Sequence, residues 1–265
     1  MGKLEGKVAI VTGGGRGIGR AVALAYAREG AAVAIASRTR SEVEQVAAEA
    51  TREGARALAF PADVTDEAAV MRLVNATVAA FGRCDVLVTG AGVAEPIAEV
   101  ADLGLAEWEA GLRGNLTSTF LCCRAVLPHM RRQGSGKILN VASGLAVIPL
   151  PGVGAYSAAK AAVVQLSRVL TEELRPNGIQ VFAIAPGMIR TRVLGGLFGP
   201  GDARMPESIR HRIDRLERDR LLITAEQSAR LFLFLTTDAG KELSGQFVRW
   251  DDAAVQTCLA AFLRT

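Results

Sequence analysis

Apolar residues along this chain follow two alternating patterns, short continuous runs and longer stretches with helical spacing. The first run, residues 8–11, is rich in β-branched residues and stops at a cluster of glycines, as a buried parallel strand does. The next stretch places Ile18, Val22 and Tyr26 on one face of a helix. Gly30 closes that stretch, and the alternation then continues along the chain.

The pattern predicts six further strands after the first, at 33–36, 56–60, 86–88, 137–141, 179–184 and 246–249. It predicts helices at 40–53, 66–82, 107–131, 155–175, 206–220 and 226–236. Strands that alternate with helices at this spacing form a parallel sheet covered on both faces. We therefore expect an α/β protein with a single Rossmann-type doubly wound sheet of about seven parallel strands flanked by helices. No internal repeat or shift of composition divides residues 1–265, so we expect one domain.

Composition excludes several classes of function. Half of the residues are apolar and 22% are charged, which predicts a large core and argues against extensive disorder. The net charge is +4 with bases and acids interleaved, so we expect no nucleic-acid partner. No apolar run approaches the roughly 18 residues of a membrane span, and Gly6 stands where a myristoylation signal needs Ser or Thr. The four cysteines lack metal-ligand spacing, so we expect no metal and a reduced, cytoplasmic protein.

The turn after the first strand is rich in glycine. It reads Thr12-Gly13-Gly14-Gly15-Arg16-Gly17-Ile18-Gly19 and opens the first predicted helix. Glycines in this context let the backbone approach a pyrophosphate, whose charge lies at the helix N-terminus. No Gly-Lys-Ser/Thr sequence ends the turn, which disfavours a nucleoside triphosphate site. A merely flexible turn is the alternative.

The end of the second strand bears on the choice between NAD and NADP. NAD-binding proteins place an Asp or Glu there to hold the ribose 2′-hydroxyl, whereas this chain has Ser37 and Arg38. A guanidinium can pair with a 2′-phosphate, and Arg16 could add a second positive contact. The sequence thus favours NADP(H), with NAD(H) as the alternative if Arg38 is only a solvated surface charge.

A tyrosine and a lysine lie four residues apart in the sequence Tyr156-Ser-Ala-Ala-Lys160. On a helix this spacing puts both side chains on one face, where the ammonium would favour the phenolate. Taken alone, the pair could equally be a surface contact. His129 and His211 are the only histidines, which leaves few bases for a hydrolase triad.

Together these motifs resemble those of the short-chain dehydrogenase/reductase family, including its 3-oxoacyl-carrier-protein reductase-like members. The resemblance runs from Lys7 to about Arg249 and keeps the family's order of elements. Those elements are the glycine turn at 12–19, Asp63-Val64, Ala91-Gly92, Asn115, Ser143 placed 13 residues before Tyr156, Lys160, Pro186-Gly187 and Thr191.

The resemblance implies roles for the catalytic residues. Tyr156 would be the general acid in reduction and the base in oxidation. Lys160 would lower the pKa of the phenol and hold the nicotinamide ribose. Ser143 would stabilise the developing oxyanion, and Asn115 would anchor a water that links the lysine to solvent. A helix-interior asparagine that satisfies backbone groups is the alternative for Asn115.

The resemblance also implies the cofactor contacts. Residues of the turn would cradle the phosphates, namely Thr12, Gly13, Gly15, Arg16, Gly17, Ile18 and Gly19. Asp63 and Val64 would contact adenine, and Ala91 and Gly92 would line its ribose. Tyr156, Lys160, Pro186, Gly187, Ile189 and Thr191 would lie around the nicotinamide end. The chain departs from the family at Thr89-Gly90, where Asn-Asn is usual, and at Trp250–Ala253, where Asp-Gly-Gly is frequent.

The substrate is expected to be a small carbonyl compound or alcohol with an apolar body. Apolar residues of 144–155 and 188–220 would wall its pocket, and glycines in 195–201 would let residues 188–220 act as a lid. The arginines of 204–220 interleave with acids, which favours a solvated helix over an anion site. Three functions remain open: an NADPH-dependent reductase of a ketone or 3-oxoacyl thioester, an alcohol or steroid dehydrogenase working oxidatively, and a non-catalytic nucleotide-sensing or scaffold protein. Family members are commonly homotetramers or homodimers.

Overall fold

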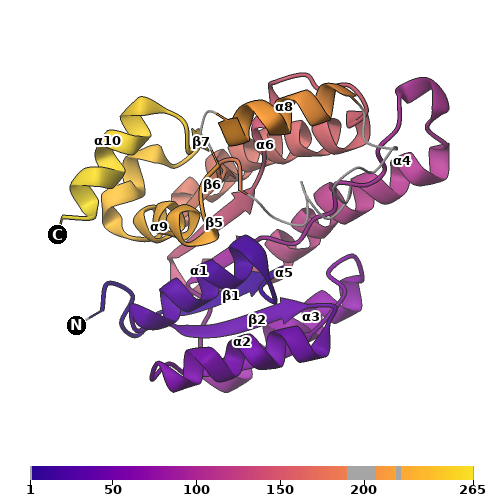
Figure 1. Cartoon of the computed structure of the whole chain (residues 1–265). Coiled ribbons are helices and arrows are strands. Elements are labelled where there is room, and N and C mark those ends of the chain that lie inside the picture. Colours follow the sequence, from indigo (N-terminus) through magenta and orange to yellow (C-terminus); the bar gives the residue numbers. More distant parts are fainter. Residues whose placement is uncertain (1, 190–206, 219–221, 265) are drawn as a thin grey trace.

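Seven parallel strands form one sheet in the computed structural model, which describes residues 2–189, 207–218 and 222–264 (Figure 1). The strands are ordered β3-β2-β1-β4-β5-β6-β7 across the sheet. Their bounds are β1 Val8–Thr12, β2 Ala32–Ser37, β3 Ala57–Pro61, β4 Val86–Thr89, β5 Gly136–Val141, β6 Ile179–Ala185 and β7 Phe247–Arg249. This confirms the predicted doubly wound α/β sheet.

Helices connect the strands and cover both faces of the sheet. They are α1 Gly17–Arg28, α2 Arg40–Arg52, α3 Glu67–Phe81, α4 Leu105–Leu112, α5 Ser118–Gln133, α6 Gly154–Leu174, α8 Glu207–Arg218, α9 Ala225–Thr236 and α10 Ala253–Phe262. Asp66 is the N-cap of α3, since its side chain accepts a hydrogen bond from the backbone N–H of Ala68. Within the described residues no helix is long and apolar enough to cross a membrane.

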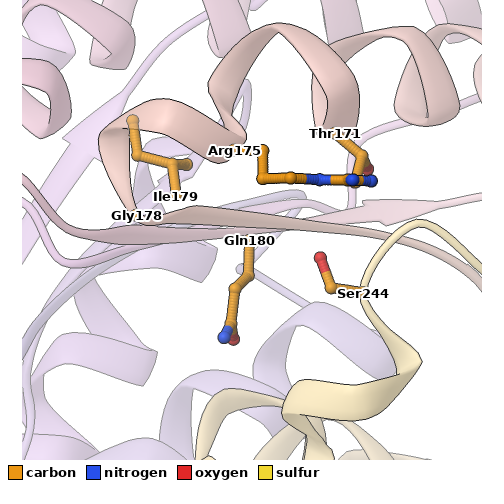
Figure 2. Close-up of a pocket in the computed structure, with 6 residues that line it drawn as sticks. All are labelled: Thr171, Arg175, Gly178, Ile179, Gln180 and Ser244. Carbon is orange, nitrogen blue, oxygen red and sulfur yellow. The ribbon is translucent and has the colours of Figure 1, made fainter.

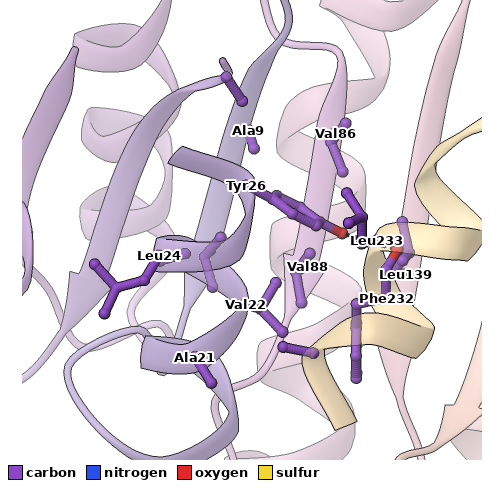
Figure 3. Close-up of a cluster of buried hydrophobic side chains, with 14 of the residues drawn as sticks. Ala9, Ala21, Val22, Leu24, Tyr26, Val86, Val88, Leu139, Phe232 and Leu233 are labelled. Atoms are coloured by element: carbon purple, nitrogen blue, oxygen red, sulfur yellow. Dashed lines mark hydrogen bonds between the residues drawn. The ribbon is translucent and has the colours of Figure 1, made fainter. Parts of the chain in front are cut away.

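Side chains that alternate along β1 divide the core into two layers. Ala9 and Val11 face a cluster built with α1, α2, α9 and α10, whereas Ile10 faces a cluster built with α3, α5 and α6. Figure 3 shows the first cluster, in which Tyr26 of α1 reaches toward Phe232 of α9. The Tyr26 hydroxyl is hydrogen-bonded to Thr236, so this tyrosine belongs to the scaffold.

The predicted helices differ from the structure in two places. The helix expected at 107–131 is interrupted, because α4 and α5 are joined by a π-helical turn, Arg113–Thr117. A π turn of five residues is too short for the pattern of apolar positions to reveal it. Helix α10 was not predicted, although Asp252 caps it by accepting from the backbone of Ala254 and Val255.

The strand order reverses between β1 and β4, which lie side by side at the centre of the sheet. In open parallel sheets the crevice beyond the carboxyl ends of such strands is where ligands bind. Thr12 pairs with Thr89, and Thr89 pairs with Asn140, so β1, β4 and β5 end at a common level. The glycine turn and Ser143 both follow these ends directly.

Candidate active site

The four predicted catalytic residues come from separate elements at the carboxyl edge of the sheet. Tyr156 and Lys160 lie on α6, Ser143 follows β5, and Asn115 lies in the π turn between α4 and α5. The structure brings Ser143 and Lys160 to the same tyrosine.

The hydroxyl of Ser143 is oriented by the backbone that follows it. Ser143 is the N-cap of a short 3-10 turn, Gly144–Ala146, and its Oγ accepts a hydrogen bond from Leu145 N at 3.2 Å. The hydroxyl proton remains for another acceptor, and Ser143 also forms a side-chain hydrogen bond with Tyr156. Ser143 thus offers a donor beside the phenol.

Lys160 is a buried cation, with a relative exposure of 3%. Its Nζ donates a hydrogen bond to Val141 O at 2.8 Å and lies 5.6 Å from the centre of the Tyr156 ring. Burial lowers the pKa of Lys160 to about 8, because the charged form loses hydration. The ammonium is therefore held beside the phenol but loses its proton more readily than an exposed lysine.

The pKa of Tyr156 differs in direction from the sequence-based expectation. Burial raises it, and the hydrogen bond with Ser143 offsets only part of the increase. We expected Lys160 to lower this pKa; in the structure the shift is upward, and its causes are burial and the Ser143 hydrogen bond. The phenol is therefore protonated at neutral pH, the state that a proton donor requires.

The Asn115 side chain forms hydrogen bonds with backbone groups of two segments. Its Nδ2 donates to Val93 O at 2.7 Å and Gly111 O at 3.0 Å, while its Oδ1 accepts from Val93 N at 3.3 Å. These bonds tie the segment after β4 to the π turn. A Cβ on Gly92 would lie 2.8 Å from Asn115 Oδ1 and 3.5 Å from Lys160 Nζ, so Asn115 and Lys160 both border Gly92.

Three glycines bring separate backbone segments into direct contact at the mouth of the site. Gly13 has φ +67°, and a Cβ there would lie 2.6 Å from Gly90 C. A Cβ on Gly90 would lie 2.6 Å from Thr12 O, so an asparagine, usual in the family at this position, would not fit without movement. A Cβ on Gly19 would overlap the carbonyl oxygen of Gly13. This close packing shapes the turn as a cradle made of backbone.

Hydrogen bonds of Thr12 join the start of the glycine turn to the end of β4. Thr12 Oγ1 donates to Val88 O and accepts from Ala91 N, both at 3.3 Å. Gly17 has φ +55° and begins α1, with Ile18 as its second residue. The turn therefore presents the N-terminus of α1 beside β4.

At the adenosine end of the expected cofactor site, Ser37 is the last residue of β2 and Arg38 follows it. Asp63 and Val64 follow β3. Hydrogen bonds from Thr65 lower the pKa of Asp63, and the nearby charge of Arg38 lowers it further. Ser37 Oγ is buried and has no hydrogen-bond partner among the described residues. A buried hydroxyl without a partner beside a glycine cradle fits a bound polar group such as a nucleotide ribose.

The segment after β6 is anchored at its first residues. Pro186 O accepts a hydrogen bond from Ser228 Oγ at 2.8 Å, and Gly187 has φ +93° where a Cβ would meet Ile223 and Trp250. Ile189 is buried and pairs with Ile223. Thr191 and the glycines of 195–201 lie outside the described residues, as does most of the expected lid.

The departure at Thr89 is accommodated by a buried chain of hydrogen bonds. Thr89 Oγ1 donates to Asn140 Oδ1 at 3.0 Å, and Asn140 Nδ2 donates to Ser167 Oγ at 3.0 Å. The chain links β4, β5 and α6, so the threonine hydroxyl braces the centre of the sheet directly below the site.

A small apolar cluster borders Tyr156. It consists of Val153 with the partly buried Ile97, Leu145 and Leu150 packed around it and the tyrosine ring. Leu145, Leu150 and Val153 were expected as pocket wall, whereas Val147 is 59% exposed. Ile97 was not predicted to line the pocket, because it lies in a segment without periodicity. The neighbouring residue Ala98 forms a β-bridge with Val153, a contact that exists only in the folded chain.

A cavity of about 270 Å³ lies at the opposite end of β6 (Figure 2). Its lining residues are Thr171, Arg175, Gly178, Ile179, Gln180 and Ser244. They surround the amino end of the strand, far from the carboxyl edge where Tyr156 lies, so this cavity is not part of the site.

Comparison with known proteins decides the family. The model of the short chain dehydrogenase family matches residues 7–198. The chain belongs to this family.

Two curated relatives cover nearly the whole of this short-chain dehydrogenase. It is 39% identical over 245 residues to a cis-4-hydroxycyclohexanecarboxylate dehydrogenase of Sinomonas cyclohexanicum, covering 92% of this chain and 95% of the relative. It is 32% identical over 254 residues to a 3-oxoacyl-(acyl-carrier-protein) reductase of Thermotoga maritima, covering 96% and 99% of the two chains.

Solved structures agree with the fold. A 7α-hydroxysteroid dehydrogenase complexed with NADH and 7-oxo glycochenodeoxycholic acid superposes with a TM-score of 0.84 at 30% identity, covering 93% of each chain. An NAD⁺-bound xylitol dehydrogenase superposes with a TM-score of 0.85 at 29% identity, covering 94% of this chain and 98% of the other. The short-chain dehydrogenase described here is therefore an oxidoreductase that acts on CH–OH and C=O groups with a nicotinamide cofactor.

Proposed function

We propose that this short-chain dehydrogenase is a single catalytic domain that reduces a ketone or 3-oxoacyl substrate with an apolar body, preferring NADP(H). The observation that carries the proposal is the meeting of Ser143, Tyr156 and Lys160 beside the glycine cradle and the apolar cluster. The cofactor supplies the hydride when bound. The described residues supply the proton, the oxyanion partner and the apolar surface.

The proton moves from Tyr156 to the substrate oxygen as negative charge builds there. Burial keeps the phenol protonated, so Tyr156 is ready to donate at neutral pH. Ser143 is fixed by Leu145 N and donates to the same oxygen, which stabilises the oxyanion. Lys160, whose Nζ donates a hydrogen bond to Val141 O, stabilises the negative charge left on the phenol after the proton is transferred.

The charge of Lys160 predicts the pH dependence of reduction. Its pKa of about 8 means that the cation is present below pH 8 and is lost as the pH rises through 8. Tyr156, with its raised pKa, stays protonated over this range. We expect kcat/KM for reduction to be level from pH 6 to 7.5 and to fall above pH 8.

Lys137 provides the control for this profile. Burial also lowers its pKa to about 8, but it donates to Thr237 O at the other end of β5. The Lys137→Gln variant should keep the same fall in rate. A profile that stays level to pH 9.5 in the wild-type protein would contradict the role given to Lys160.

Arg38 supports the proposed preference for NADP(H). It is exposed after the end of β2, and its positive charge lowers the pKa of Asp63 on the other side of the expected adenosine site. We expect Arg38→Glu to lower kcat/KM with NADPH by roughly 30-fold or more, because a carboxylate replaces the partner of a 2′-phosphate. The Arg40→Glu variant makes the same charge change two residues away and should have little effect. If Arg38→Glu keeps the preference for NADPH, the role proposed for Arg38 is wrong.

The apolar cluster around Tyr156 favours substrates with an apolar body. The relatives named above are a dehydrogenase of a hydroxycyclohexane carboxylate and a reductase of 3-oxoacyl carrier-protein substrates, which supports an alcohol or ketone with an apolar body. We test the proposal with NADPH oxidation against a panel of cyclic ketones and 3-oxoacyl thioesters. Turnover with one of them supports it, whereas faster oxidation of the matching alcohols at neutral pH favours an alcohol or steroid dehydrogenase working oxidatively.

Assembly and location complete the proposal. We infer a homodimer or homotetramer in the cytoplasm, supported by partly exposed apolar side chains on the two long helices, Phe120 on α5 and Val169 on α6. Light scattering should give a mass of two or four chains. A mass of one chain at micromolar concentration would contradict this.

A further inference from the structure

A carboxylate that the sequence pattern did not single out lies beside the glycine turn. Glu42 is in the first turn of α2, and its Oε1 lies 3.7 Å from Nη1 of Arg16. Arg16 was expected to add positive charge for a 2′-phosphate. In the structure that charge is countered by an acidic side chain of the protein itself.

Ser37 and Glu42 both lie close to Gly15 of the glycine turn. A Cβ on Gly15 would lie 2.7 Å from Ser37 Oγ and 3.0 Å from Glu42 Oε2, so glycine at this position lets the turn approach both side chains closely. The Ser37 hydroxyl is buried there without a partner among the described residues, and the Glu42 side chain is 29% exposed. A hydroxyl and a carboxylate thus face the turn together, ready to bind a group that can donate a hydrogen bond.

A carboxylate discriminates between the two dinucleotides. It accepts a hydrogen bond from a ribose 2′-hydroxyl, as the acid at the end of the second strand does in NAD-binding folds. It repels a 2′-phosphate, because both groups are negative. In this chain the end of β2 carries Ser37 and Arg38, and the acid reaches the cradle from the following helix instead.

We propose that Glu42 is a specificity-determining residue for the cofactor. Its carboxylate supports NAD(H) through the ribose 2′-hydroxyl and weakens NADP(H) by neutralising Arg16 and repelling the 2′-phosphate. The proposal rests on the proposed function, since it places the dinucleotide along the glycine turn. Arg38 and Glu42 then act in opposition, so the preference for NADP(H) is weaker than Arg38 alone would produce.

Direct binding tests this without turnover. Isothermal titration of the full chain with NADP⁺ and with NAD⁺ is compared between the wild type and Glu42→Gln. We expect the Kd for NADP⁺ to fall about tenfold and the Kd for NAD⁺ to rise about threefold in the variant. Titration with adenosine 2′,5′-bisphosphate and adenosine 5′-monophosphate should show the same change of preference, because the effect lies at the adenosine end.

Glu44→Gln is the matched control. Glu44 lies on the same helix and pairs with Arg40 rather than Arg16, so its loss should leave the ratio of the two Kd values unchanged. An unchanged ratio in Glu42→Gln, or an equal change in Glu44→Gln, would overturn the inference while leaving the proposed function intact. A wild-type protein that binds neither dinucleotide would overturn both.

Discussion

Replacement of Tyr156 by phenylalanine is expected to lower kcat for carbonyl reduction by about 10³-fold, within the range of general acid catalysis. The phenol, which we propose as the proton donor, lies with Ser143 and Lys160, and the change removes only its oxygen. The apolar ring still packs against Val153, so the fold and the cofactor cradle are expected to persist. The measurement is kcat with NADPH and the best ketone of the panel, together with the Kd for NADPH, which should change less than threefold.

Tyr26 is a natural control, because the chain has only two tyrosines. Its hydroxyl is buried and bonded to Thr236, so Tyr26→Phe should cost about 1–2 kcal/mol of unfolding free energy. It should leave kcat nearly unchanged. If Tyr156→Phe keeps a rate close to that of the wild type, the proton must come from another group and the assigned mechanism is wrong.

Replacement of Gly19 by alanine is expected to abolish tight cofactor binding and to destabilise the protein. The added Cβ would overlap the carbonyl oxygen of Gly13 and lie 2.7 Å from its carbonyl carbon. Gly13 cannot yield easily, because its own φ is positive and its backbone packs on Gly90. We expect a loss of about 1–3 kcal/mol of unfolding free energy in urea, typical of overpacking, and at least a 100-fold weaker Kd for NADPH.

Gly104→Ala is the control for this substitution. Gly104 precedes α4, and the contact for its added Cβ is the flexible Glu107 side chain, at 3.3 Å. Cofactor binding should then be unaffected and stability should change by less than about 0.5 kcal/mol. Wild-type affinity for NADPH in Gly19→Ala would show that the turn does not cradle the cofactor.

The sequence pattern predicted the sheet well because each strand is signalled twice. The runs 8–11 and 86–88 are continuously apolar, and a glycine follows each of them two residues later. Burial on both faces demands such runs in a parallel sheet. The seven strands therefore matched their expected positions within about two residues.

The parts that sequence could not predict depend on contacts between distant segments. The π turn that holds Asn115 is five residues long, too short to be read from the apolar pattern. Ile97 reaches Tyr156 through a segment with no periodic signal, and Glu42 reads as an ordinary charge on a solvated helix. Only the folded chain places that carboxylate beside Gly15 and Arg16.

The pKa shifts of Tyr156 and Lys160 also depend on the folded structure. The spacing of Tyr156 and Lys160 indicated an electrostatic pair, and the structure confirms that the two side chains are close. The cost of burying both groups cannot be judged from spacing alone. Burial raises the pKa of the tyrosine and lowers that of the lysine, which is the direction expected when each charged form loses water.

Hydride transfer itself is the most direct test of the account. NADPH carrying deuterium at both C4 positions is incubated with the enzyme and the ketone and thioester panel, and the products are examined by mass spectrometry and NMR. The account predicts one deuterium on the new carbinol carbon with the wild-type protein and about 10³-fold less in the same time with Tyr156→Phe. Normal binding of NADPH with no deuterium in any product would contradict it and favour a protein that senses the nucleotide without turnover.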